Sequence, residues 1–155
     1  MSVDETEKVV CDDIAVQALR GDVVETWIMC GLTSDYREFT LRATAPDGQI
    51  YEVTEDVSIW HCFRQLRKQL GEDNIRFLCN GARVDFRPSG MALSMSYGNV
   101  GYLLPPRKPS RFSLKNLFNR KANIPPHARI FEPALLEQTG TVDEQDAYAQ
   151  EYFRS

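Results

Sequence analysis

The chain has 155 residues, of which 43% are hydrophobic, and its formal net charge at pH 7 is -4. This length is enough to bury one core and too short for two ordinary domains, so we expect a single domain with tails. The negative charge argues against a general attraction to nucleic acid or to an anionic membrane, because both favour a positive protein surface.

The sequence carries no recognisable signal for export or for metal binding. Asp4, Glu5 and Glu7 stand where a signal or transit peptide needs a basic start followed by an apolar block. No apolar run approaches the length of a membrane span. The four cysteines are widely spaced, and neither they nor the two histidines follow the pattern of a zinc site. We therefore expect a cytoplasmic protein with reduced thiols, no metal and no cofactor, while the spacing leaves two disulfides open as an alternative.

The first predicted element is a short helix over residues 9–20. Asp12 and Asp13 precede an apolar stripe and Gly21 follows it, in the order of a cap, a helical face and a stop. Residues 23–29 form an apolar cluster whose period fits either a strand or a helical turn, so both structures stay open there.

Residues 38–55 predict an antiparallel hairpin. Apolar and polar side chains alternate from residue 38 to residue 45, a Pro-Asp-Gly turn follows, and a second β-rich run continues to residue 55. The register of the second strand stays open, because Ile50 and Tyr51 cannot both face the core.

The main helix is predicted over residues 58–70, with Ser58 as its cap and Gly71 as its end. Residues 75–79 then alternate as a strand, and Asn80-Gly81 before another apolar run is a strong signal for a tight hairpin. A last strand is predicted over residues 100–104, and a final helix near the C-terminus. We expect one core that contains Phe39, Leu41, Phe63, Leu66, Leu70 and Phe77.

The order of a hairpin, a helix and the strand and turn in IRFLCNGARV resembles the ubiquitin-like β-grasp, in which a sheet grips one helix. The resemblance covers residues 36–104 and implies an α+β fold with a mixed sheet packed on one main helix. Extra helical segments are expected on both sides of it. The implied division has three parts. Residues 1–35 are an acidic N-terminal segment with a short helix, and residues 36–105 are the β-grasp-like core. Residues 106–155 are a C-terminal extension that is first basic and then acidic.

A second resemblance concerns residues 79–91, CNGARVDFRPSGM, which are similar to a recurrent stretch in small, mostly uncharacterised bacterial proteins. Small acidic bacterial proteins of this size include immunity proteins for intercellular toxins. The implied function is non-catalytic protein binding, in which an acidic surface occludes a basic toxin domain.

No catalytic residue is predicted. His61 and Cys62 are neighbours in sequence, but adjacent residues of a helix point about 100° apart, which argues against a catalytic dyad. The glycines Gly81 and Gly90 lack the context of a phosphate-binding loop. We therefore expect that the protein is not an enzyme.

The predicted partner-binding residues are acidic side chains near the N-terminus and a polar cluster that follows the Asn-Gly turn. They are Asp12, Asp13, Asp22, Glu25, Arg83, Asp85 and Arg87. The alternative for Arg83 and Asp85 is a surface ion pair of little energetic value. Three other functions stay open: a ubiquitin-like adaptor that binds through its sheet, a small enzyme, and nucleic-acid binding by the basic stretch 107–121.

Overall fold

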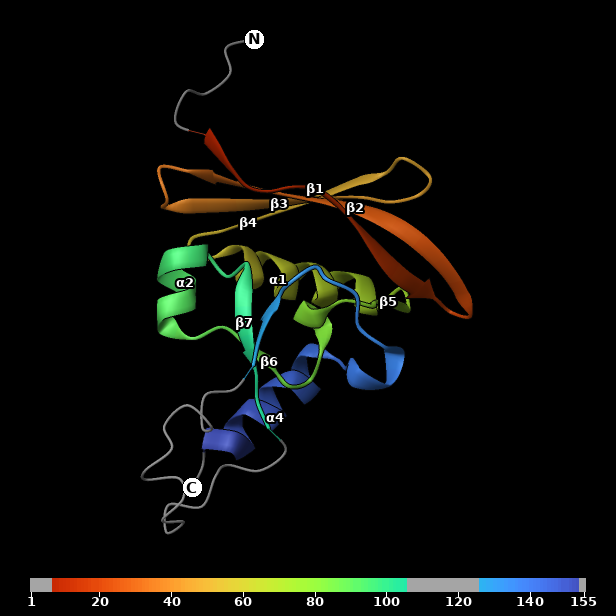
Figure 1. The fold of residues 1–155 in the computed structure, drawn as a ribbon. Coiled ribbons are helices and arrows are strands. Elements are labelled where there is room, and N and C mark those ends of the chain that lie inside the picture. The colour runs from red at the N-terminus through yellow and green to blue at the C-terminus, as the bar shows by residue number, and fades with distance from the viewer. Residues whose placement is uncertain (1–6, 106–125, 154–155) are drawn as a thin grey trace.

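The computed structural model describes residues 7–105 and 126–153. A five-stranded antiparallel sheet forms its upper layer in Figure 1, and the strands lie in the order β4-β3-β2-β1-β5. The sheet curls over helix α1 (Ile59–Gly71). Its strands are β1 (Glu7–Arg20), β2 (Val23–Ser34), β3 (Glu38–Thr44), β4 (Ile50–Glu55) and β5 (Ile75–Phe77).

A second layer covers the opposite side of α1. It contains a three-stranded antiparallel sheet in the order β6-β7-β8, and helix α4 (Val142–Phe153) below it in Figure 1. The strands are β6 (Phe86–Arg87), β7 (Val100–Leu103) and β8 (His127–Arg129), and the shorter helices are η1 (Asn80–Ala82), α2 (Gly90–Ser96) and η3 (Leu136–Gln138). The protein is therefore an α+β fold in which α1 is enclosed between two layers.

The helix expected over residues 9–20 is wrong, because these residues form most of strand β1. Two irregularities in the pairing of β1 with β2, between Val9 and Cys11 and between Cys11 and Ile14, interrupt the two-residue alternation. Such β-bulges make the apolar spacing of a strand resemble that of a helix. Gly21, expected as a helix stop, instead has φ +62 in the tight turn between β1 and β2.

The open segment at residues 23–29 is also a strand. Trp27 and Met29 of β2 are fully buried in the core, whereas Ile28 between them points to the other face of the sheet and is exposed. Strand β2 pairs directly with the hairpin, since residues 28–34 of β2 lie beside the whole of β3. The boundary expected between residues 35 and 36 therefore falls in a turn of one sheet.

The predicted hairpin over residues 38–55 and the predicted main helix are confirmed. Tyr51 resolves the register, because its ring lies 5.5 Å from that of Trp27 while Ile50 is exposed. Ser58 caps α1, since its hydroxyl accepts a hydrogen bond from the backbone N–H of His61. The predicted core is confirmed, with Phe39, Leu41, Phe63, Leu66, Leu70 and Phe77 all in one buried cluster.

The hairpin expected at Asn80-Gly81 is wrong. These residues form the 3-10 helix η1, and β5 pairs with β1 rather than with the chain that follows. The reason is tertiary: Gly81 N–H donates to the carbonyl of Ile130, and a Cβ on Gly81 would lie 2.5 Å from Cγ1 of that residue. The glycine is needed for close packing and not for a turn between strands.

The mixed sheet expected from the β-grasp resemblance is not found, since every strand pair in the described part of the chain is antiparallel. The predicted strand near residue 100 is present as β7, but it belongs to the smaller sheet. The predicted C-terminal helix is present as α4. No helix in residues 7–105 and 126–153 is long and apolar enough to cross a membrane.

Candidate binding surfaces

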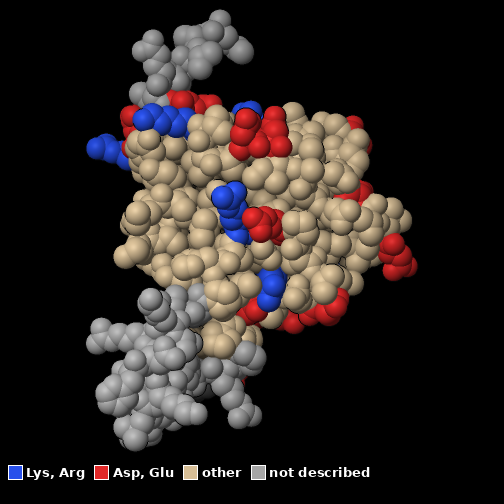
Figure 2. Space-filling view, in the orientation of Figure 1, with Lys and Arg blue, Asp and Glu red and all other residues tan. Residues whose placement is uncertain are grey.

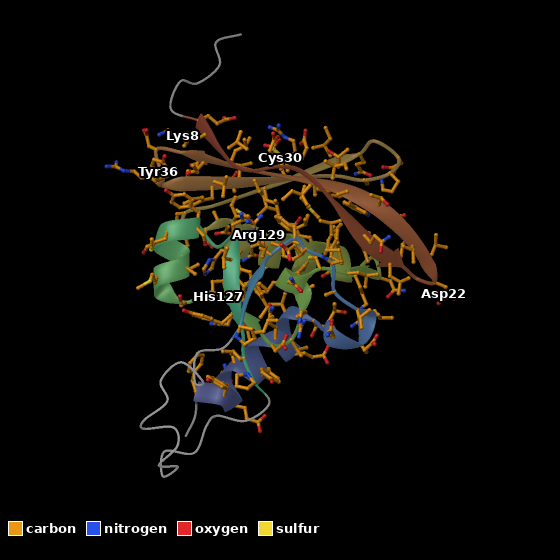
Figure 3. The ribbon with its side chains drawn as sticks, viewed as in Figure 1. Lys8, Asp22, Cys30, Tyr36, His127 and Arg129 are labelled. Carbon is orange, nitrogen blue, oxygen red and sulfur yellow. The ribbon has the colours of Figure 1, made fainter. Side chains whose placement is uncertain are left out.

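Helix α2 exposes large apolar side chains. Met91 and Met95 have relative exposures of 70% and 75%, and no residue of this helix is buried. They are four residues apart and so lie on one side of the helix. Two further exposed apolar side chains, Tyr36 and Val57, lie at the same end of the molecule, where Tyr36 is labelled in Figure 3. We call Tyr36, Val57, Met91 and Met95 the apolar patch.

A hollow of about 570 Å³ lies at the same end of the molecule. Tyr36, Val57 and Tyr97 line it together with Leu93 and Ser94 of α2. Met91 and Met95 belong to the same short helix as Leu93 and Ser94, but they are not among the residues that line the hollow. Large apolar side chains around a concave surface are typical of protein-binding sites.

Aromatic stacking makes the floor of the hollow rigid. The rings of Tyr36 and Tyr97 are stacked with centroids 5.2 Å apart, and Phe39 of the core lies 5.8 Å from Tyr97. The ammonium group of Lys8 lies 4.9 Å from the centroid of the Tyr36 ring. An aromatic surface that is already ordered loses little conformational entropy when a partner binds it.

The predicted acidic residues do not come together in one surface. Asp12 and Asp13 lie beside Cys30 near the middle of the sheet, whereas Asp22 is at the far tip of the β1–β2 hairpin (Figure 3). Glu25 has a structural role, because its carboxylate accepts hydrogen bonds from Arg20 and from Nε1 of the buried Trp27. In Figure 2 acidic side chains lie mainly around the margins of the visible face, and much of that face is uncharged.

The polar cluster lies in the second layer. Arg83 donates two hydrogen bonds of 2.8 Å to Asp85, which raises the pKa of the guanidinium, and both side chains are mostly buried. The two residues do form an ion pair, but it is mostly buried and not the surface pair that the alternative expected. Arg87 does not join this pair: its Nη1 lies 3.4 Å from Oδ1 of Asp146 on α4.

His61 and three of the four cysteines lie in surroundings typical of structural residues. Nδ1 of His61 lies 2.8 Å from the Ser58 hydroxyl, but Ser58 is fully buried and caps α1, so its oxygen is out of reach of a substrate. Burial, followed by the charge of Arg64, lowers the pKa of His61. The four cysteines are free. Burial raises the pKa of three of them to about 12, which removes thiolate chemistry near neutral pH: these are Cys11, Cys62 and Cys79.

Within the part of the chain that the structure describes, one group of potential metal ligands comes together. One ligand atom each from Asp12, Asp13 and Cys30 lies within 4.8 Å of the others. Exposed acidic groups often meet in this way without an ion, so the cluster does not by itself define a metal centre. The cysteines and histidines that zinc would favour are otherwise dispersed, three of the thiols being buried.

Sequence reasoning missed the apolar patch. The signal that was available is the four-residue spacing of Met91 and Met95 in a segment with no other helical stripe. The basic stretch 107–121, for which nucleic-acid binding stays open, lies outside the described residues. No protein-family model matches the chain, and no curated protein is significantly similar to it.

Proposed function

We propose that this protein is a non-catalytic binding protein that acts in a stoichiometric complex with another protein. The observation that carries the proposal is the apolar patch, where Met91 and Met95 are largely exposed on a helix with no buried residue. Methionine side chains are flexible and polarisable, and they are common in surfaces that bind other proteins. Burial of the patch would stabilise a complex in proportion to the apolar area removed from water.

The particular form that we propose is an immunity protein whose partner is a basic bacterial toxin domain. Its support is the net charge of -4 together with exposed carboxylates such as Asp12, Asp13 and Asp22. Toxins that cut nucleic acid tend to be basic, because their substrate is anionic, and opposite charge accelerates encounter between two proteins. The patch would then hold the complex after the charges have brought the partners together.

The absence of catalysis is part of this proposal. Its support is the burial of the candidate nucleophiles, since Ser58, Cys62 and Cys79 have no exposed surface. A nucleophile that cannot reach a substrate cannot attack it.

A ubiquitin-like adaptor is the second candidate, and the open face of the sheet favours it. Ile28 on β2 is opposite Thr44 on β3, which is opposite Ile50 on β4, so these side chains share the face that α1 does not cover. Val24 lies on the same face, and Val24, Ile28 and Ile50 are exposed. Against the β-grasp form of this candidate, β5 lies beside β1 in an antiparallel pairing and not beside the hairpin that precedes α1.

The proposal is tested by mixing the purified protein with the product of the adjacent reading frame and measuring the association rate over a range of salt concentrations. We expect a complex whose association rate falls steeply with salt, and a shallower fall for a variant with Asp12→Asn, Asp13→Asn and Asp22→Asn. No association at low salt with any neighbouring gene product would remove the immunity form and leave the adaptor ahead.

A further inference from the structure

One buried donor has no acceptor in the described part of the chain. It is Nε1 of Trp60, a residue with 2% relative exposure at the start of α1. The other indole of the protein differs, because Nε1 of Trp27 donates a hydrogen bond of 3.0 Å to Glu25. A buried polar group without a partner is uncommon and calls for an explanation, such as an ion or ligand that binds there.

Two guanidinium groups lie against the same indole. Cζ of Arg64 is 4.8 Å and Cζ of Arg87 is 5.1 Å from the centroid of the Trp60 ring. Both arginines share one carboxylate, and the sharing is unequal. Arg64 donates two hydrogen bonds of 2.7 Å to Asp146, whereas Arg87 reaches the same carboxylate with a single contact of 3.4 Å. Among the residues that the structure describes, Asp146 is the one acceptor found for Arg87, so other N–H donors of this guanidinium remain available for a ligand.

These residues line a pocket of about 490 Å³ between α1 and α4, which we call the basic pocket. Lys68 and His61 line it as well, and the ammonium group of Lys68 forms no ion pair with any residue that the structure describes. Three cationic side chains therefore face two carboxylates, those of Asp146 and Glu55. An excess of positive charge in a half-enclosed pocket is unusual in a chain of net charge -4.

The geometry points to a phosphate-binding site: we propose that the basic pocket binds a phosphoryl oxyanion, as free phosphate or as a small phosphate monoester. Arginine is well suited to this ligand, because its planar group of N–H donors matches two oxygens of a phosphate. An oxygen that reached Nε1 of Trp60 would supply the acceptor that this donor lacks. Arg87 and Lys68 would supply the charge that Asp146 does not neutralise.

This site is separate from the apolar patch, since none of its lining residues borders the hollow beside α2. A phosphate site and a protein-binding surface are therefore tested independently, and the failure of one leaves the other intact.

The test is a titration of the full-length ¹⁵N-labelled protein with inorganic phosphate, and separately with glycerol phosphate, followed through the two indole N–H resonances. The chain has two tryptophans, so Trp27 is an internal control. We expect the Trp60 resonance to shift in a saturable way and the Trp27 resonance to stay in place. Tighter binding of glycerol phosphate would identify a monoester as the ligand, and equal or weaker binding would identify free phosphate.

Two matched variants show where the anion binds. Arg87→Gln should weaken binding about tenfold, the loss expected for one hydrogen bond to a charged group. Arg42→Gln makes the same change of charge on β3, where Arg42 pairs with Glu52 outside the pocket, and should bind as the parent does. An unmoved Trp60 resonance, an equal shift with chloride at matched ionic strength, or unchanged binding by Arg87→Gln would each overturn the proposal.

Discussion

Arg67 on α1 donates a hydrogen bond of 2.9 Å to Oε1 of Gln145 on α4, and both side chains are buried. The remaining hydrogen bonds of the guanidinium go to the backbone carbonyls of Gly81 and Gly140. Burial lowers the pKa of Arg67 to about 10, so it stays charged near neutral pH. Its charge is thus held by carbonyl and amide oxygens that come from the second layer.

Gln145→Leu should destabilise the fold by about 2–4 kcal/mol, because it leaves a buried charge with fewer acceptors. The change also removes an amide that donates to the carbonyls of Gly81, Arg83 and Phe86. Denaturant unfolding measures the loss. Gln150→Leu on the exposed side of the same helix is the control and should change the free energy of unfolding little. Equal unfolding midpoints for both variants would show that the buried network contributes little.

Alkylation in the native state should label the chain at Cys30 alone. Burial raises the pKa of Cys30 as well, but this thiol is partly exposed, whereas Cys11, Cys62 and Cys79 are buried. Mass spectrometry should find slow addition of one label to the folded protein and rapid addition of four after unfolding. The Cys30→Ser variant should take up none while folded. Rapid native labelling of any other cysteine would contradict the core as described.

Stability should fall as the pH drops below the ordinary pKa of histidine, in part because of His61. Its pKa in the folded protein is lowered, so the unfolded chain takes up the proton more readily. The contribution of His61 to stability is therefore complete above the unfolded pKa of 6.5 and is lost below it. Unfolding measured from about pH 7.5 to about pH 5.5 should show a smaller loss for His61→Gln than for the parent. The same pH dependence in both proteins would count against the burial of this ring.

Freshly purified protein should contain no stoichiometric metal. Among the residues that the structure describes, the potential ligands that come together are Asp12, Asp13 and Cys30, and one of these three is a sulfur. Elemental analysis checks this expectation. A metal signal of one per chain that disappears in Cys30→Ser would show that the cluster is a true site, while a signal that persists would place the ion elsewhere.

The elements that were predicted correctly from the sequence are those fixed by local signals. Ser58 followed by apolar residues at helical spacing defines α1, and the alternation in residues 38–45 defines β3. The errors come from interactions between distant segments. Asp13 adopts φ 30 at a bulge, and Gly81 is fixed by packing against Ile130. Neither effect can be read from neighbouring residues.

The candidate surface was harder to predict than the fold. An apolar side chain in a short segment usually belongs to the core, so the exposure of Met91 and Met95 is known only from the tertiary structure. Of the charged residues predicted to bind a partner, Asp12, Asp13 and Asp22 are exposed. Glu25, Arg83 and Asp85 instead form hydrogen bonds within the protein. Charge alone does not distinguish a binding residue from a structural one.

The central claim is that the apolar patch binds another protein, and the affinity of a patch variant for the partner tests it most directly. The measurement is isothermal titration calorimetry of the product of the adjacent reading frame with the parent, with Met91→Ser/Met95→Ser, and with Val23→Ser. Val23 is exposed at the tip of the β1–β2 hairpin and is the control for loss of an apolar side chain. We predict a one-to-one complex that the double variant weakens about tenfold to hundredfold, while Val23→Ser binds as the parent does. Binding by the double variant with the affinity of the parent, or no binding by the parent at all, would contradict the claim.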